Sequence, residues 1–255
     1  MPWRGEIAFA DEALAFRGES AENRFHAHAA VQCVYAKTGV RIRDAGGRVF
    51  EGPGWLIRSG VAHSLDPSPK LTLILIEPQS RLAMGLLRQV DAPPITVLPE
   101  EFGVLVDPFP SLADGLAAFK QHYAGAQPAV DRRVLAALEH LGAVTARDAA
   151  AVAAAHAGLS TSRLRALCTH QLGVPFAKLV LWRKVRRACA SMNAGHGLAQ
   201  AAADAGFADQ AHLTRTMSEV IGLTPGVAAR VGDFFKTDLH PKQEDGAGSK
   251  RRRFR

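Results

Sequence analysis

The feature that most constrains the fold is a repeated corner in the second half of the chain. Ala154 lies four positions before Gly158, and Ala202 lies four positions before Gly206. Each pair is followed by an amphipathic helical run. The spacing from the glycine to the leucine of that run is one residue longer in the second copy (Gly206 to Leu213) than in the first (Gly158 to Leu164). The small alanine lets two helices approach closely, and the glycine accepts the left-handed backbone that ends the first of them. The repeat therefore predicts two helix-turn-helix units.

Positive charge is concentrated in the half that carries the repeat. Residues 125–255 hold 19 Lys and Arg against 10 Asp and Glu, whereas residues 1–124 hold 12 against 14. Paired helix-turn-helix units in a basic segment are typical of proteins that bind the DNA polyanion. The nearly neutral front half is expected to have a different role.

Length and composition limit the class of protein further. With 255 residues, of which 47% are hydrophobic and 22% charged, the chain is long enough for two globular domains. It has no apolar run long enough to span a bilayer, and its start does not read as a signal peptide. Cys33, Cys168 and Cys189 are scattered and odd in number, which suits a reducing compartment. We therefore expect a cytoplasmic protein without membrane contact.

The front half reads as short strands followed by one helix. The β-rich runs, separated by turns, are residues 31–36, 40–43, 54–57 and 71–77. Many short strands at even spacing predict a sandwich or barrel. Ser111 can cap a helix that extends to Tyr123 with its apolar residues on one side.

A long helix is predicted between the two units. Pro175 can start it and Asn193 can end it, so about 19 residues at ~1.5 Å each span roughly 28 Å. Successive major-groove faces of B-DNA lie about 34 Å apart, so such a rod can place two helices in adjacent grooves. Its cations are expected to face phosphates between the grooves: Arg183, Lys184, Arg186 and Arg187.

Residues 205–217 and the Gly-Leu-Thr-Pro sequence at 222–225 resemble the AraC-type double helix-turn-helix domain. The resemblance covers about residues 129–231 and implies a transcription regulator that binds DNA. By position it implies base contacts from Ser162, Arg163, Arg165, Ala166, Gln210, Ala211, Thr214 and Arg215. Ala166 stands where that family usually carries arginine, so the first reading helix is expected to read DNA differently.

Side-chain chemistry favours three of these residues for base recognition. Arginine can bond guanine through two N–H groups and glutamine can bond adenine, which singles out Arg165, Gln210 and Arg215. The alternative is that all of them form merely solvated helix faces.

In the front half, two segments resemble the motifs of the cupin family. The first comprises His26, His28, Gln32 and Gly39, and the second comprises Gly52, Arg58, Gly60 and His63. In a strand, His26 and His28 point to the same face, and His63 from a later hairpin can join them. Three imidazoles and one amide can form a Zn, Ni or Fe site. Gln32 replaces the glutamate usual in metal-binding cupins, and Arg58 replaces a usual proline.

Three roles remain open for this cluster: a divalent metal site, the lining of an effector pocket, or ordinary core histidines. We expect no obligatory cofactor, with the metal as the alternative. The residues expected to line an effector pocket at the barrel mouth are His26, His28, Gln32, Tyr35, Trp55 and His63.

These observations together predict an α+β chain of two domains. They are a cupin-like sensor barrel at 1–107, a helix and linker at 108–128 that can serve as a dimer contact, an all-α double helix-turn-helix domain at 129–235 and a disordered basic tail at 236–255. The predicted function is a sequence-specific transcription regulator, not an enzyme, that responds to a small molecule. Double-stranded DNA and the effector are its expected partners, with a homodimer and RNA polymerase as further ones. The alternatives are a metal-dependent cupin enzyme with an accessory helical domain and a nonspecific architectural DNA binder.

Overall fold

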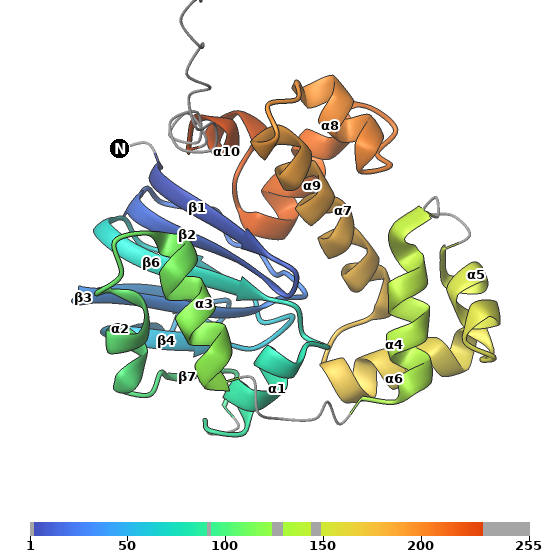
Figure 1. Ribbon diagram of the computed structural model, residues 1–255, viewed down its shortest axis with the longest axis horizontal. Coiled ribbons are helices and arrows are strands. Elements are labelled where there is room, and N and C mark those ends of the chain that lie inside the picture. Colours follow the sequence, from blue (N-terminus) through green and yellow to red (C-terminus); the bar gives the residue numbers. More distant parts are fainter. Residues whose placement is uncertain (1–2, 91–92, 124–129, 144–148, 232–255) are drawn as a thin grey trace, which may run out of the picture.

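The computed structural model describes residues 3–90, 93–123, 130–143 and 149–231 (Figure 1). The predicted linker at 125–128 and the predicted basic tail at 236–255 lie outside these ranges. A mainly β half is followed by an all-helical half, so the predicted α+β architecture is confirmed. Among the described residues, no helix combines the length and the apolar character that crossing a membrane requires.

One antiparallel sheet of seven strands forms the front half, here called the sheet domain. The strands are β1 (Arg4–Ala10), β2 (Ala13–Ser20), β3 (Val31–Asp44), β4 (Val49–Ile57), β5 (His63–Leu65), β6 (Ser68–Ile76) and β7 (Ile95–Val97). They pair in the order β1-β2-β6-β3-β4-β7, with β5 on β3. The runs predicted from sequence fall in β3, β4 and β6. Closure into a barrel stays a prediction, because no pairing within the described ranges joins β1 to β7.

Helices follow the sheet and then make up the rest of the chain. Those of the sheet domain are α1 (Arg81–Leu87), α2 (Glu101–Val106) and α3 (Leu112–Tyr123). Those of the helical half are α4 (Arg132–Glu139), α5 (Ala149–His156), α6 (Thr161–Leu172), α7 (Phe176–Asn193), α8 (Leu198–Asp204), α9 (Gln210–Ile221) and α10 (Pro225–Val231), with a 3-10 turn at His140–Ala143.

Local capping sets the ends of the helices that matter for function. The Ser160 hydroxyl accepts the backbone N–H of Arg163 at the start of α6, and the Asp209 carboxylate accepts that of His212 at the start of α9. Both helices end at a glycine in the left-handed conformation, with φ of 73° at Gly173 and 72° at Gly222. The sequence predicted these starts and stops correctly.

The sheet is apolar on both faces because successive side chains point in opposite directions. Val31 and Cys33 of β3 pack in one core with α1, α2 and α3, whereas Val34 belongs to a second core that includes the helical half. The apolar side of α3 is buried in the first of these cores. Its exposed side is therefore the one left for the dimer contact predicted at 108–128.

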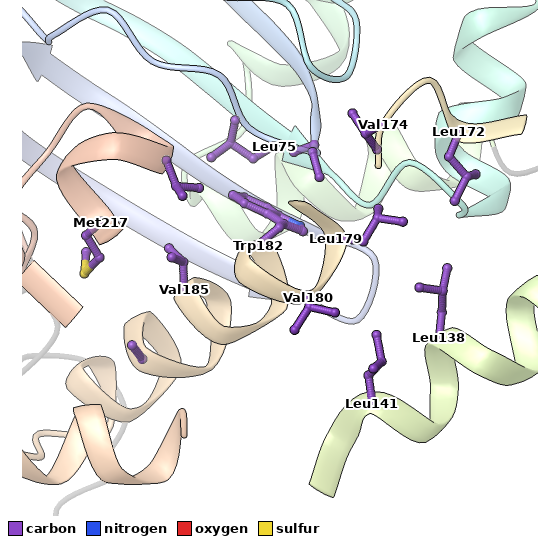
Figure 2. Packing of buried hydrophobic residues seen from close by; sticks show 14 of the residues in the cluster. Leu75, Leu138, Leu141, Leu172, Val174, Leu179, Val180, Trp182, Val185 and Met217 are labelled. Carbon is purple, nitrogen blue, oxygen red and sulfur yellow. The ribbon is translucent and has the colours of Figure 1, made fainter. Parts of the chain in front are cut away.

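The long helix α7 joins the two halves into one apolar core (Figure 2). Trp182 is fully buried and lies near Leu75 of β6, while Val180 lies on the side of Leu138 and Leu141. Side chains from the sheet and from the helical half thus belong to one continuous cluster. Full burial of a side chain of this size contributes about 3 kcal/mol, so α7 anchors the halves to each other.

Candidate functional site

The two copies of the repeated corner have the same geometry. Ala154 and Ala202 are fully buried, and φ is 63° at Gly158 and 73° at Gly206. In both copies, the residue after the glycine donates its backbone N–H to the carbonyl of the alanine at 2.8 Å. The pairs α5–α6 and α8–α9 are therefore two helix-turn-helix units, here called the first and the second unit. The predicted repeat is confirmed.

The residues predicted to contact DNA lie on the outer faces of α6 and α9. Those that are exposed are Ser162, Arg163, Arg165, Ala166, Gln210, Ala211 and Arg215. Thr214 is half-buried, and its hydroxyl donates to the carbonyl of Gln210 at 2.9 Å, which leaves its methyl group for a base contact. Within the part of the chain that the structure describes, no carboxylate forms an ion pair with the arginines at 163, 165 and 215, so they are available to bases or phosphates equally.

The cations of α7 were predicted to face solvent and phosphates, but this prediction was wrong. The Arg183 guanidinium donates to the carbonyl of Leu138, and that of Arg187 donates to the carbonyls of Leu141 and Ala205. These groups bind helix ends within the helical half instead of phosphates. Helix periodicity could not reveal this, because the acceptors come from segments far away in the sequence.

Lys184 is also buried, against the corner of the second unit. Its ammonium group donates to the carbonyl of Gly206 and lies 5.4 Å from the centre of the Phe207 ring. Burial lowers the pKa of this lysine, with a smaller contribution from the nearby Arg187. Lys184 therefore connects α7 to the corner of the second unit, a contact that sequence reasoning missed.

Glu77 connects α7 to the sheet domain. Its buried carboxylate accepts the Trp182 indole N–H at 2.9 Å and the Arg186 guanidinium at 2.6 Å. Arg186 also donates to the carbonyls of Ala10 and Asp11 at 3.0 and 3.2 Å. The sequence carried a signal for this buried carboxylate, because Glu77 is a single acidic residue directly after the apolar strand β6. The sequence analysis did not recognise it.

The three predicted histidines come together. His26 and His63 pair through two backbone hydrogen bonds of 3.1 and 3.0 Å, and His28 lies beside them. One ring nitrogen from each lies within 4.8 Å of the other two. The Gln32 amide oxygen lies 2.9 Å from His28 Nε2 and 3.2 Å from His63 Nε2. The structure thus places the predicted ligand set in one cluster.

Hydrogen bonds fix which ring nitrogen carries the proton. Each Nδ1 faces a backbone carbonyl, of Arg24, Ala30 or Val61, at 2.9 to 3.0 Å. A carbonyl only accepts, so each Nδ1 carries the proton and each neutral ring keeps its Nε2 lone pair. Burial lowers the pKa of all three rings, to about 4 for His26, and repulsion from His28 adds to the shift at His26. The rings are therefore neutral at pH 7.

The cluster consists of acceptors facing each other, which fits a divalent cation. The Nε2 atoms of His28 and His63 converge on the Gln32 oxygen without a donor among them, and a ring nitrogen of His26 lies within 4.8 Å of a nitrogen of each. The Gln32 amide nitrogen is buried without a partner. Turning the amide over would give two rings a donor but leave its oxygen unpaired. A bound cation would satisfy all four atoms, and the carbonyls on Nδ1 are the partners that orient metal-binding histidines.

Next to the cluster lies a partly open cavity of about 670 Å³ between the sheet domain and the helical half. The sheet domain contributes His26, His28 and Gln32, and the helical half contributes Trp182 and Ile221 among others. The remaining wall is largely apolar. A site of this size and character suits a small organic ligand. A second hollow of about 650 Å³ beside α4 is lined mainly by charged side chains.

Two residues predicted to line the effector pocket lie elsewhere. Tyr35 belongs to the opposite face of β3 from Gln32, where its ring packs 6.0 Å from that of Phe102. Trp55 packs against Phe50 at 5.4 Å. Neither residue lines the cavity. His63 belongs to the histidine cluster but does not line the cavity either.

Comparisons with known proteins agree with this geometry. Residues 153–230 match the family model described as a helix-turn-helix domain. ToxT from Vibrio cholerae O395 aligns with a TM-score of 0.57 at 12% identity, over 90% of this chain and 100% of that one. ToxT of strain SCE256 with a bound unsaturated fatty acid gives 0.56 at 10% identity, over 87% and 96%. A search of curated proteins finds no significant match.

At these identities, the likeness to ToxT shows the fold alone. The family match carries the assignment of the helical half, because it covers both corners and both predicted reading helices. Residues 153–230 therefore match a helix-turn-helix domain, within a chain that shares the two-domain fold of ToxT.

Proposed function

We propose that this protein is a cytoplasmic, sequence-specific transcription regulator whose DNA binding responds to a small molecule, and not an enzyme. The observation that carries the proposal is the position of the cavity. Its walls come from both the sheet domain and the DNA-binding half, so a bound molecule contacts both. A ligand with different affinity for two arrangements of these parts shifts their populations and thereby the affinity for DNA.

DNA recognition is tested first by selecting a preferred duplex from a random library with the full chain. Arg165→Ala and Arg215→Ala each remove one exposed reading residue, and Lys178→Ala, on exposed α7 surface, is the matched control. Loss of a base contact lowers the free-energy difference between binding to the selected duplex and to a mismatched one by about 1–3 kcal/mol. An architectural DNA binder predicts equal affinity for selected and scrambled duplexes, which would refute the proposal.

The composition of the cavity wall indicates the ligand class. The wall is largely apolar, which favours an apolar ligand. Among the described lining residues, Arg186 is the one Lys or Arg, and Glu77 already neutralises it. We therefore propose an uncharged ligand.

The charge of the ligand is tested with a matched pair of probes. We expect 1-decanol to raise the melting temperature of the full chain more than decanoate at equal free concentration, since a buried carboxylate lacks a free cation here. Solved ToxT structures contain an unsaturated fatty acid or a naphthalenyl butenoic acid. A larger shift with decanoate would refute the uncharged class and favour an acidic ligand.

We also propose that His26, His28, His63 and Gln32 hold a divalent transition metal beside the cavity. The convergence of four acceptor atoms supports it. Bound there, a metal would supply a Lewis-acid site for a ligand oxygen. Calorimetry with Zn²⁺ alone should give one site per chain that His63→Ala abolishes, whereas His170→Ala on exposed α6 retains it.

The same cluster is what favours the second candidate, a metal-dependent cupin enzyme. An enzyme of this kind must convert a substrate, and a chelator that removes the metal must stop the conversion. If the metal-loaded protein changes DNA affinity and turns over no member of a substrate panel, the regulator proposal stands. A homodimer and contact with RNA polymerase are further proposals, tested by light scattering and by transcription in vitro.

A further inference from the structure

The sheet domain touches the C-terminal cap of each reading helix, at two different loops. A methyl group built on Gly60, in the turn between β4 and β5, would lie 2.9 Å from Val174 and 3.5 Å from the carbonyl of Gly173. A methyl group on Gly222 would lie 2.9 Å from both the Arg24 carbonyl and His26 Nδ1. Gly173 ends α6 and Gly222 ends α9, so both reading helices are held at their ends.

The histidine cluster joins the two holding loops. His26 belongs to the loop that meets α9, and His63 follows the turn that meets α6. The two residues are paired by backbone hydrogen bonds, and the Gly60 N–H donates to the carbonyl of His28 at 2.8 Å. Two loops of the sheet domain that are hydrogen-bonded to each other therefore meet the two reading helices.

The cavity meets only one of these contacts. Ile221 and Leu223, on either side of Gly222, line it, as do His26 and Asn23 on the facing loop. Further lining comes from α7, α8 and α10. No lining residue belongs to the described parts of α4, α5 or α6, nor to the contact of Gly60 with Val174.

We propose that a ligand in this cavity moves only the second helix-turn-helix unit, because the first unit is held to the sheet domain at a contact outside the cavity. The consequence is a change in the separation of α6 and α9, and hence in how well the two helices fit two adjacent grooves of one duplex. This inference rests on the proposed function and specifies how its ligand acts.

The test uses asparagine at glycines, because asparagine tolerates the left-handed backbone and can end a helix. Gly222→Asn places a side chain against the Arg24 carbonyl, whereas Gly173→Asn at the matched cap meets nothing within 4 Å. Gly60→Asn is directed at Val174, whereas Gly47→Asn, at a similar φ of 81°, meets nothing. Each pair has similar backbone strain and differs in the contact.

Pulsed electron resonance on the full chain then measures two distances without DNA. Cysteines that carry nitroxide labels replace exposed residues in two combinations. Labels at Lys37 and Glu219 report the distance from the sheet domain to α9, and labels at Lys37 and His170 report the distance to α6. Burial raises the pKa of all three native thiols, so labelling at pH 7 favours introduced cysteines. We expect Gly222→Asn to lengthen only the distance to α9 and Gly60→Asn only the distance to α6, with both controls unchanged.

Bound 1-decanol is expected to change the distance to α9 and leave the distance to α6 as it was. With the selected duplex, Gly222→Asn should reduce discrimination at the α9 half-site by about tenfold, the factor that 1.4 kcal/mol gives, and spare the α6 half-site. The inference is overturned if Gly222→Asn behaves as Gly173→Asn, or if bound decanol moves both helices or neither. A chain without DNA specificity refutes the proposed function instead, while the distances still decide this inference.

Discussion

The connection between Glu77 and α7 allows a quantitative prediction. Glu77 accepts the Trp182 indole and the Arg186 guanidinium with one oxygen, and the Gln79 amide with the other at 2.9 Å. Glu77→Gln keeps one acceptor, removes the charge that faces Arg186 and turns a donor toward the Gln79 amide. Hydrogen bonds to charged groups contribute about 1.5–3 kcal/mol each. We expect the free energy of unfolding to fall by about 3 kcal/mol.

Glu51 is the matched control for this measurement. Its ion pair with Arg41 has the same chemistry and a similar length of 2.7 Å, but both side chains are more than half exposed. Exposed pairs contribute about 0.2–1 kcal/mol, so Glu51→Gln should cost less than ~1 kcal/mol. Screening makes the effect of Glu51→Gln shrink further in 1 M salt, while that of Glu77→Gln persists.

Urea unfolding of the full chain, monitored at several wavelengths, measures both losses. A double-mutant cycle with Arg186→Gln then isolates the pairwise energy between Glu77 and Arg186. The reasoning is refuted if the two glutamate variants differ by less than ~0.5 kcal/mol, the usual error of additivity. It is also refuted if the coupling between Glu77 and Arg186 vanishes in high salt.

Three further predictions follow from single side chains. Arg215→Ala should weaken binding to the selected duplex about tenfold or more while Lys178→Ala does not, measured by fluorescence anisotropy; equal losses would assign Arg215 to phosphates. Asp209→Ala should lower the free energy of unfolding by about 0.5–2 kcal/mol and weaken DNA binding, because α9 loses its N-terminal cap. Ser160→Ala should have the same effects through α6. Unchanged melting temperatures in both variants would contradict the role of these caps. Burial raises the pKa of Cys189 to about 12, so its thiol stays protonated at pH 8 and should react with iodoacetamide far more slowly than free cysteine; a rate equal to that of free cysteine would contradict this.

Features that follow local rules could be predicted from the sequence. Ser160 and Asp209 start the reading helices, and Gly173 and Gly222 end them, because capping depends on a few neighbouring residues. The convergence of the three histidines was also predicted, since motif spacing placed them near one another. The residues on the outer side of each reading helix were given by the resemblance to the AraC-type domain.

Features that depend on distant partners could not be predicted. The charges of α7 look solvent-exposed by composition, yet Arg186 is bound by Glu77 and Lys184 by the corner at Gly206. The prediction that Tyr35 shares a pocket with Gln32 was a different kind of error, because the odd spacing of the two along β3 already placed them on opposite faces of the sheet. The cavity itself lies between segments more than 100 residues apart, so no single segment carries its signature.

The burial of Trp182 has a consequence for anyone who wishes to transplant the DNA-binding half. In the intact chain, this indole is covered by the sheet domain, together with Val185 and Leu179 in the same core. Expressed alone, residues 130–231 would present that apolar surface to water, and such patches promote aggregation. A chimaera with a foreign sensor therefore needs either a new cover for this surface or polar replacements along one side of α7.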